Sequence, residues 1–239
     1  IRYMKNPTRG LPGTNRDFLI AQASGKYIKF LFDDDFLLAE SVSMLVDALE
    51  QSGAKLAFHN RHIVDGNNQL IASPQYVSGQ GCALLPAHIF FHELVGTMTN
   101  HIGEPSNIMV EAETLKALSH PFALGGVRRM RFLTDMALYT NFAALGLGIV
   151  GVAAFGSAFR RHSEQTSNQF YPGFSAGLFE WELLRRWSAD NRLLSPESYR
   201  AGVDHAVGLY QKFVQKYPEL AGFMALNRHQ VQPVYLPGP

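Results

Sequence analysis

The stretch GKYIKFLFDDD, residues 25–35, is the part of the sequence that most directly predicts the fold. Its central residues, Tyr27 to Phe32, are rich in β-formers and nearly all apolar, which is typical of a strand buried on both faces of a parallel or mixed sheet. Three carboxylates follow immediately: Asp33, Asp34 and Asp35. Because ligand sites in open α/β sheets lie at the carboxyl ends of strands, this stretch predicts an α/β fold with a binding site at the acidic cluster.

The acidic cluster is itself informative about the ligand. Adjacent carboxylates repel one another by about 1 kcal/mol per close pair even in water, and a bound cation relieves that repulsion. Magnesium and manganese prefer oxygen ligands and often bridge to substrate phosphates. A solvated acidic turn before the helix that begins near Ser41 is the alternative, and metal binding is the favoured interpretation.

Strands and helices alternate on either side of this cluster. Apolar spacing predicts helices over residues 16–24 and 41–52, and Asp65-Gly66-Asn67-Asn68 predicts a hairpin turn. Further on we expect a helix over 134–145, a strand over 148–155 and a polar loop over 156–168. The pattern then becomes helical, over 178–187 and 196–217, before a proline-rich tail at 230–239.

Composition narrows the class of protein. The 239 residues, 46% of them hydrophobic, suit one globular domain with or without a helical appendage. The net charge of +1 gives no reason to expect nucleic-acid binding. The single cysteine fits a reducing, cytoplasmic location. No apolar run approaches the roughly 20 residues of a membrane span, which leaves peripheral contact with the inner face of a membrane open.

Five motifs in order resemble those of family 2 glycosyltransferases. Residues 25–40 resemble the signature A-x-G-x-Y-I-x-F-L-x-x-D-D-x-L-x-P-E of that family. Residues 10–17 resemble its glycine-rich loop and helix start, and residues 103–107 its acceptor-side glycine loop. Residues 133–138 resemble the helix start that carries the catalytic base, and residues 159–167 the closing Y-R-x-H-x-x-Q-x-S loop. The resemblance extends to about residue 168 and has no counterpart beyond about residue 170.

The resemblance implies a GT-A fold and an inverting transfer from a nucleotide-diphosphate sugar to the hydroxyl of a glycan or lipid-linked acceptor, in the synthesis of surface polysaccharide or a related glycan. It also implies a divalent cation, manganese or magnesium, on the donor diphosphate. The site residues that it implies are Asp34, Asp35 and His162 for the metal, Arg16, Asp17, Asp33, Arg160 and His162 for the donor, Gly103, Ser106 and Thr134 for the acceptor side, and Asp135 as the base.

Two positions depart from the family pattern. Phe32 replaces an acid that many members have, which puts the ribose contact in doubt, and Thr134 replaces the usual Glu. Asp135 therefore stands alone where the base is expected. A helix start favours its anionic form, which a general base must hold, although Thr134 and Asp135 could equally serve as a helix cap.

The basic and aromatic residues near these motifs remain open to two interpretations. Arg160 and Arg161 beside His162 suit a phosphate but also a solvated loop. The basic turn at 128–131 could meet an anionic acceptor, although a solvated turn is favoured, and Trp181 is expected in a core rather than at a sugar.

The sequence thus predicts two parts. Residues 1–168 form a GT-A-like catalytic domain with a mixed sheet, N-terminally incomplete because the family's first strand–helix–strand unit is not seen before Ile1, and residues 169–239 form a helical C-terminal extension. The alternative to an enzyme is a truncated, non-catalytic domain of the same fold that acts as an interaction scaffold. A nucleotidyltransferase is disfavoured because the sequence contains no matching glycine-rich, Lys/Arg-containing pyrophosphate loop.

Overall fold

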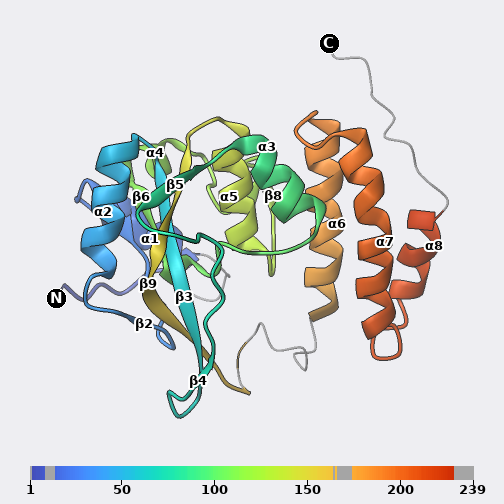
Figure 1. Cartoon of the computed structure of the whole chain (residues 1–239), viewed down its shortest axis with the longest axis horizontal. Coiled ribbons are helices and arrows are strands. Elements are labelled where there is room, and N and C mark those ends of the chain that lie inside the picture. The colour runs from blue at the N-terminus through green and yellow to red at the C-terminus, as the bar shows by residue number, and fades with distance from the viewer. Residues whose placement is uncertain (1, 9–13, 164, 166–173, 229–239) are drawn as a thin grey trace.

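The computed structural model of the chain describes residues 2–8, 14–163, 165 and 174–228 (Figure 1). Its centre is a seven-stranded mixed sheet with the order β1-β6-β3-β9-β2, in which β4 pairs with β3 and β5 with β9. The pairing of β3 with β9 is parallel and the others are antiparallel. The strands are β1 (Tyr27–Lys29), β2 (Phe36–Leu37), β3 (Leu56–Asp65), β4 (Leu70–Ala72), β5 (Cys82–Leu85), β6 (Ile108–Glu111) and β9 (Ile149–Arg161).

The sheet is apolar on both faces because its central strands alternate two sets of buried side chains. Ala57, Met109 and Val150 pack on the face covered by α2 (Ser41–Ser52). Their neighbours along the same strands, which include Leu56 and Phe58, point to the opposite face. That face is covered by α5 (Thr134–Ala144) and the π-helix η1 (Phe90–Gly96), and Figure 1 shows α2 and α5 on opposite sides of the strands.

Smaller elements complete this layer. Helices α1 (Thr14–Gln22) and α4 (Ala112–Ala117) contribute Ile20 and Leu115 to the larger core cluster. The short helix α3 (Ala87–Ile89) leads into η1, the 3-10 turn η2 (Pro105–Asn107) leads into β6, and β7 (Ala123–Leu124) pairs with β8 (Arg128–Arg129) in a separate two-stranded sheet before α5.

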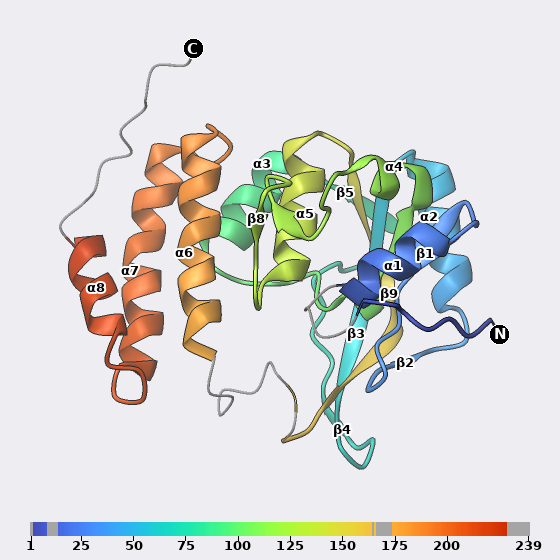
Figure 2. The ribbon, with the colours of Figure 1, turned by 180° about the vertical axis from the view of Figure 1, so that it is seen from behind.

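The C-terminal helices share the core of the sheet. Helices α6 (Phe174–Asp190), α7 (Pro196–Phe213) and α8 (Leu220–Arg228) lie side by side beyond η1 (Figures 1 and 2). Their buried side chains, among them Leu184, Tyr210 and Leu220, belong to the same hydrophobic cluster as those of α5 and η1. The helical part is therefore packed onto the sheet layer through one continuous core. The predicted domain boundary at residue 168 lies outside the described residues.

Most predicted elements are confirmed, with two corrections. The strand predicted over residues 27–32 and buried on both faces is shorter and only partly buried, because β1 ends at Lys29 and lies at the edge of the sheet, where it pairs with β6. Helix α2 begins at Ser41 and ends where Gly53 adopts a left-handed φ of 69°, as the sequence indicated. The predicted polar loop over 156–168 is wrong in its first part, because β9 continues to Arg161. Pairing of residues 155–161 with β3, and of Ser157 and Ala158 with β2, supplies the hydrogen bonds that hold this polar stretch in the sheet. The tail at 230–239 is outside the described residues.

The buried side chain of Asn107 connects three segments of the chain by hydrogen bonds. The Asn107 amide, 1% exposed, donates to the carbonyl oxygens of His59 (2.5 Å) and Ile102 (2.6 Å) and accepts from the Ser157 hydroxyl (2.9 Å). Strands β3 and β9 are thereby joined to the segment that leads into β6. An apolar side chain at this position could make none of these three hydrogen bonds.

We expect Asn107→Ala to lower the free energy of unfolding by about 2–3 kcal/mol, because buried polar groups lose their partners. Urea denaturation followed by circular dichroism measures the change. The matched control is Asn67→Ala at the exposed β3–β4 turn, for which less than about 0.5 kcal/mol is expected. Equal losses in the two variants would show that the Asn107 hydrogen bonds contribute nothing specific.

Candidate active site

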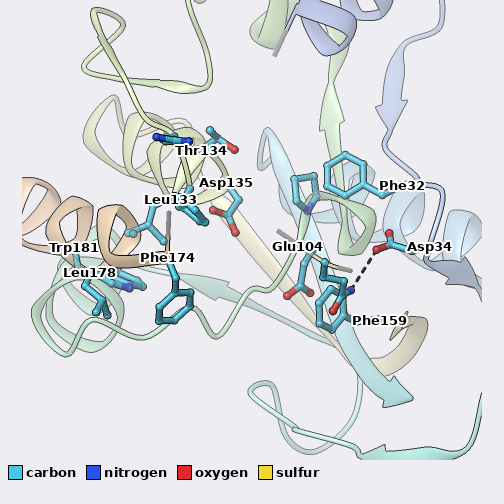
Figure 3. Close-up of a pocket in the computed structure, with 15 residues that line it drawn as sticks. Phe32, Asp34, Glu104, Leu133, Thr134, Asp135, Phe159, Phe174, Leu178 and Trp181 are labelled. Atoms are coloured by element: carbon cyan, nitrogen blue, oxygen red, sulfur yellow. Dashed lines mark hydrogen bonds between the residues drawn. The ribbon is translucent and has the colours of Figure 1, made fainter. Parts of the chain in front are cut away.

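A cavity of about 570 Å³ lies between the acidic loop after β1, the start of α5 and the side of α6. Figure 3 shows Asp34 and Phe32 on one side of it and Asp135 with Leu133 and Thr134 across from them. Its volume is in the range of ordinary ligand pockets. Its other lining residues include Glu104, Phe159, Gln165, Phe174, Leu178 and Trp181.

Asp34 is the member of the acidic cluster that faces this cavity. Its Oδ2 lies 3.4 Å from Nε2 of His162 and accepts from the Gln165 amide at 3.2 Å. Asp34 lies two residues before β2, and His162 directly follows β9, so the antiparallel pairing of β2 with β9 brings the two side chains together. Ser106 fixes the acidic loop at Phe32, because the Ser106 hydroxyl accepts a hydrogen bond from the Phe32 backbone N–H at 2.9 Å.

The other two carboxylates of the cluster point elsewhere. Asp33 is exposed and does not line the cavity. Asp35 is 9% exposed, and its Oδ1 accepts from the Arg160 backbone N–H at 3.3 Å, within β9. Burial raises the pKa of Asp35 to about 6. The mutual repulsion of the three side chains is therefore reduced by their divergence.

Asp34 and His162 fit two positions of a divalent-cation site, with one oxygen and one nitrogen donor. Within the described part of the chain, no group of three His, Cys, Asp or Glu side chains is placed to hold a metal alone. Magnesium sites in enzymes typically use one or two carboxylates and complete the coordination with water and substrate phosphates. The residues present fit such a shared site, and do not fit a closed, all-protein one.

Asp135 occupies the other side of the cavity, half-buried at the start of α5. Its Oδ1 accepts from the Met136 backbone N–H at 2.8 Å, and its Oδ2 accepts from the Asn100 amide at 2.7 Å. The pKa of Asp135 is raised to about 7, mainly by burial and also by the nearby charge of Glu104, whereas the Met136 N–H and Arg16 act to lower it. The expectation of a carboxylate kept anionic by the helix start is thus corrected: desolvation outweighs the helix N–H.

A glycine turn holds Asn100 and Glu104 in place around Asp135. Asn100 accepts from the Gly103 N–H at 2.8 Å, and Gly103 has a φ of 95°, which favours glycine. A Cβ on Gly103 would lie 2.3 Å from Nη1 of Arg61. Arg61 uses this space to place its Nε 3.0 Å from Oε2 of Glu104. The Arg61–Glu104 pair thereby fixes a second carboxylate at the cavity.

The structure brings only some of the predicted site residues together. Asp34, Thr134 and Asp135 line the cavity, and His162 contacts Asp34. The cavity is not lined by four other predicted residues, Asp33, Asp35, Gly103 and Ser106. Arg160 directs its Nε to Asn68 in the β3–β4 turn, 3.1 Å away. Arg16 donates to Thr134 Oγ1 at 3.0 Å and, with Asp17, lines a separate cavity of about 60 Å³ on the far side of Thr134.

Several cavity residues were not predicted to be functional. Glu104 lies inside the glycine motif at 103–107, and Asn100 lies just before it. Their closeness to that motif was the only sequence signal that could have marked these two residues as part of the site. Trp181 was expected in a core; it is 8% exposed, and its remaining surface lines the cavity. No local pattern marks Phe174 or Leu178 as cavity residues.

The sheet order, the acidic loop and the helix start that carries Asp135 define a GT-A-like fold of the nucleotide-sugar transferase type. Residues 1–118 match the sequence model described as "Glycosyl transferase family 2", so this part of the chain belongs to glycosyltransferase family 2. No curated protein sequence matches the chain.

Solved structures with a similar fold include Staphylococcus aureus TarS residues 1–349. The complex with UDP-GlcNAc has a TM-score of 0.50 and 12% sequence identity over 85% of this chain and 53% of TarS 1–349. The complex with UDP has a TM-score of 0.46 and 11% identity over 85% and 52%, respectively. The chain thus spans about half the length of these structures. At this identity the similarity shows the fold alone.

We expect Glu104→Gln to lower the pKa of Asp135 below about 7, because it removes a negative charge at the cavity and leaves the positive charge of Arg61 uncompensated. A ¹³C NMR titration of the Asp135 carboxyl carbon measures this pKa directly. Glu113→Gln, at an exposed position on α4, is the control and should leave it unchanged. An unchanged or raised pKa in Glu104→Gln would refute the electrostatic role of Glu104.

Proposed function

We propose that this protein transfers a sugar from a nucleotide-diphosphate donor to an acceptor hydroxyl, with inversion and with a divalent cation. The observation that carries the proposal is the single cavity with the Asp34–His162 pair on one side and Asp135 on the other. Membership of residues 1–118 in glycosyltransferase family 2 supports the same reaction class.

The Asp34 side of the cavity is the proposed donor side. Asp34 and His162 would hold a manganese or magnesium ion, and such an ion, when bound, neutralises the charge of a diphosphate leaving group. Since a TarS structure of similar fold contains UDP-GlcNAc, that nucleotide sugar is the first donor to test. Asp33, Arg16, Asp17 and Arg160 lie away from this cavity, so we assign them no direct role at the sugar.

Asp135 is the proposed general base. Asn100 orients Oδ2, and a pKa of about 7 suits a group that must accept a proton near neutral pH. The acceptor hydroxyl forms a bond to the anomeric carbon as the bond from that carbon to the diphosphate breaks, and the hydroxyl proton passes to Asp135. Attack from the side opposite the leaving group inverts the configuration at the anomeric carbon.

The acceptor is proposed to be a glycan or a lipid-linked sugar used in surface polysaccharide or related synthesis. The lone cysteine, Cys82, is exposed, which is compatible with a reducing, cytoplasmic location. Of the helices that the structure describes, none combines the length and hydrophobicity needed to cross a membrane.

We expect Asp34→Ala to abolish manganese-dependent binding of UDP, as measured by calorimetry, because it removes the oxygen donor of the proposed cation site. Circular dichroism should be unchanged, since the side chain is only partly buried. Asp47→Ala, at an exposed position on α2, is the control and should bind as the unsubstituted chain does. Undiminished manganese-dependent binding by Asp34→Ala would refute the metal assignment.

We expect the Asp135→Asn variant to transfer sugar about 10²- to 10⁴-fold more slowly than the unsubstituted chain, because the amide cannot accept the proton. UDP binding should be retained.

The raised pKa of Asp135 also predicts an effect on stability. Ionisation of Asp135 is less favourable in the folded than in the unfolded chain, so the unsubstituted protein loses stability as pH rises from about 4 through about 7. Asparagine does not ionise, so the melting temperature of the variant should not fall between pH 4 and pH 7 on account of this group, whereas that of the unsubstituted chain should.

Transfer at near the original rate by Asp135→Asn would leave Asp135 as a helix cap. Retention of UDP binding by the unsubstituted chain, without any turnover or hydrolysis of UDP-GlcNAc, would instead favour the non-catalytic scaffold.

A further inference from the structure

Helix α6 forms one side of the cavity although it lies far beyond the segment that matches the family. Phe174, Gly177, Leu178 and Trp181 line the cavity from α6, and Figure 3 shows three of them next to Leu133 and on the far side from Asp34. The family match ends at residue 118. The side of the cavity next to Asp135 is therefore built by a part of the chain to which the family match assigns no role.

Glu180 joins α6 to the segment immediately before Asp135. Its carboxylate, 7% exposed, accepts from the backbone N–H groups of Phe132 and Leu133, both at 2.8 Å, and from that of Arg131. Leu133 is the N-cap residue of α5 and makes no capping bond through its own side chain. A carboxylate from another helix thus supplies charge-assisted hydrogen bonds at this helix start.

The contact between α6 and this segment is close. A Cβ on Gly177 would lie 3.2 Å from the Cβ of Phe132, so only glycine lets the two backbones approach this far without adjustment. Behind the cavity, the Phe174 ring packs against Phe213 of α7, with ring centroids 5.4 Å apart. The α6 side is thereby fixed both to the Asp135 segment and to the helices behind it.

We propose that α6 supplies the acceptor wall of the active site, with Phe174, Leu178 and Trp181 as the surface against which the acceptor packs and Glu180 as the residue that positions Asp135 relative to that surface. This inference rests on the proposed function, because it takes the side of the cavity near Asp135 as the acceptor side.

The chemistry of this wall suits a sugar acceptor. The wall is apolar and aromatic, whereas the carboxylates of Asp135 and Glu104 line the same cavity. A pyranose has an apolar face of C–H groups and a polar edge of hydroxyls, so it can pack on the α6 residues while one hydroxyl approaches Asp135. A purely aliphatic ligand would offer no hydrogen-bond donor to these carboxylates beyond those that the protein already supplies, which are Asn100 and Met136 at Asp135 and Arg61 at Glu104.

The positioning role of Glu180 is tested with Glu180→Asp, which keeps the charge and shortens the side chain by one methylene. The shorter carboxylate cannot reach all three N–H groups, so we expect residues 131–133 to shift and Asp135 to gain water. The pKa of Asp135, followed by ¹³C NMR, should fall by about one unit or more toward the ordinary carboxyl value. Glu104, Arg16 and Tyr139, the ionisable groups that act on Asp135 or respond to it, are the same in both proteins.

Glycine variants test the same contact without altering a carboxylate. Gly177→Ala pushes α6 away from Phe132 and should lower the pKa of Asp135, whereas Gly208→Ala on α7, where an added Cβ meets nothing within 4 Å, should not. Glu113→Asp is the control for the shortened side chain. If the pKa of Asp135 and the amide shifts of residues 131–133 are unchanged in both Glu180→Asp and Gly177→Ala, the positioning role is refuted.

The acceptor wall is tested with methyl β-N-acetylglucosaminide as the probe, titrated while the Trp181 indole N–H is followed by NMR. We expect a saturable shift of this resonance. The dissociation constant should be about tenfold higher in Phe174→Ala, which corresponds to a loss of about 1.4 kcal/mol in binding free energy. Tyr3→Ala, at a position that is 88% exposed, is the control and should bind as the unsubstituted chain does. No shift at Trp181, equal binding by Phe174→Ala, or a shift produced by a short alkyl detergent but not by the sugar would overturn the sugar wall.

These outcomes are separable from failure of the proposed function. If UDP and manganese do not perturb Asp34 or His162, the donor assignment fails while the NMR results for Glu180 and Phe174 still decide the role of α6. If UDP binds at Asp34 but neither the sugar nor the Glu180 variant has its expected effect, the donor side stands and the proposed acceptor wall is wrong.

Discussion

The structure depends on one constraint, which is that a sheet with apolar side chains on both faces must be covered on both sides. Alternation along β3, β6 and β9 sends one set of side chains toward α2 and the other toward α5 and η1. With both faces covered, the ends of the strands are where polar side chains can gather around a ligand. Asp34 and His162 come from two such ends, before β2 and after β9, and Asp135 comes from the start of the covering helix α5. The C-terminal helices extend the same core and so reach the cavity from the side.

Electrostatics within the cavity follow from how deeply each carboxylate is buried. Asp35 turns into the protein and leaves Asp34 to face the cavity beside His162. Across the cavity, Asp135 is desolvated beside Glu104, and its pKa is raised to about 7. Among the described residues that line the cavity, three are carboxylates and one, Arg131, is basic, and this balance favours a cation on the Asp34 side and a hydroxyl proton donor on the Asp135 side. The same burial that gives Asp135 a pKa near neutrality reduces the stability of the fold when Asp135 ionises.

The sequence predicted the parts of the fold that depend on local patterns. The α2 helix from Ser41 to Ser52 and the turn at 65–68 are set by short-range periodicity and turn chemistry, and both are present. The strand predicted over 27–32 is only partly present, because β1 is a partly buried edge strand that ends at Lys29. The extension of β9 to Arg161 was missed because its residues, apart from Phe159, are polar or small and are held by pairing with distant strands. The same limit applies to the site. Asp34 and Asp135 were found through motifs, whereas the contacts of Glu180 with residues 131–133 span almost 50 positions and leave no local signal. Arg16 and Arg160 sit beside motif residues in the sequence, yet their side chains turn to Thr134 and Asn68.

The central claim is that donor and base share one cavity, and a crystal structure of the chain with UDP-GlcNAc and manganese tests it most directly. Anomalous scattering at the manganese edge locates the ion without assumptions about the ligand. The account predicts an anomalous peak bound by Asp34 and His162, with the diphosphate on that ion and the anomeric carbon facing Asp135. A peak elsewhere, or a nucleotide bound in the smaller cavity beside Arg16 and Asp17, would contradict it.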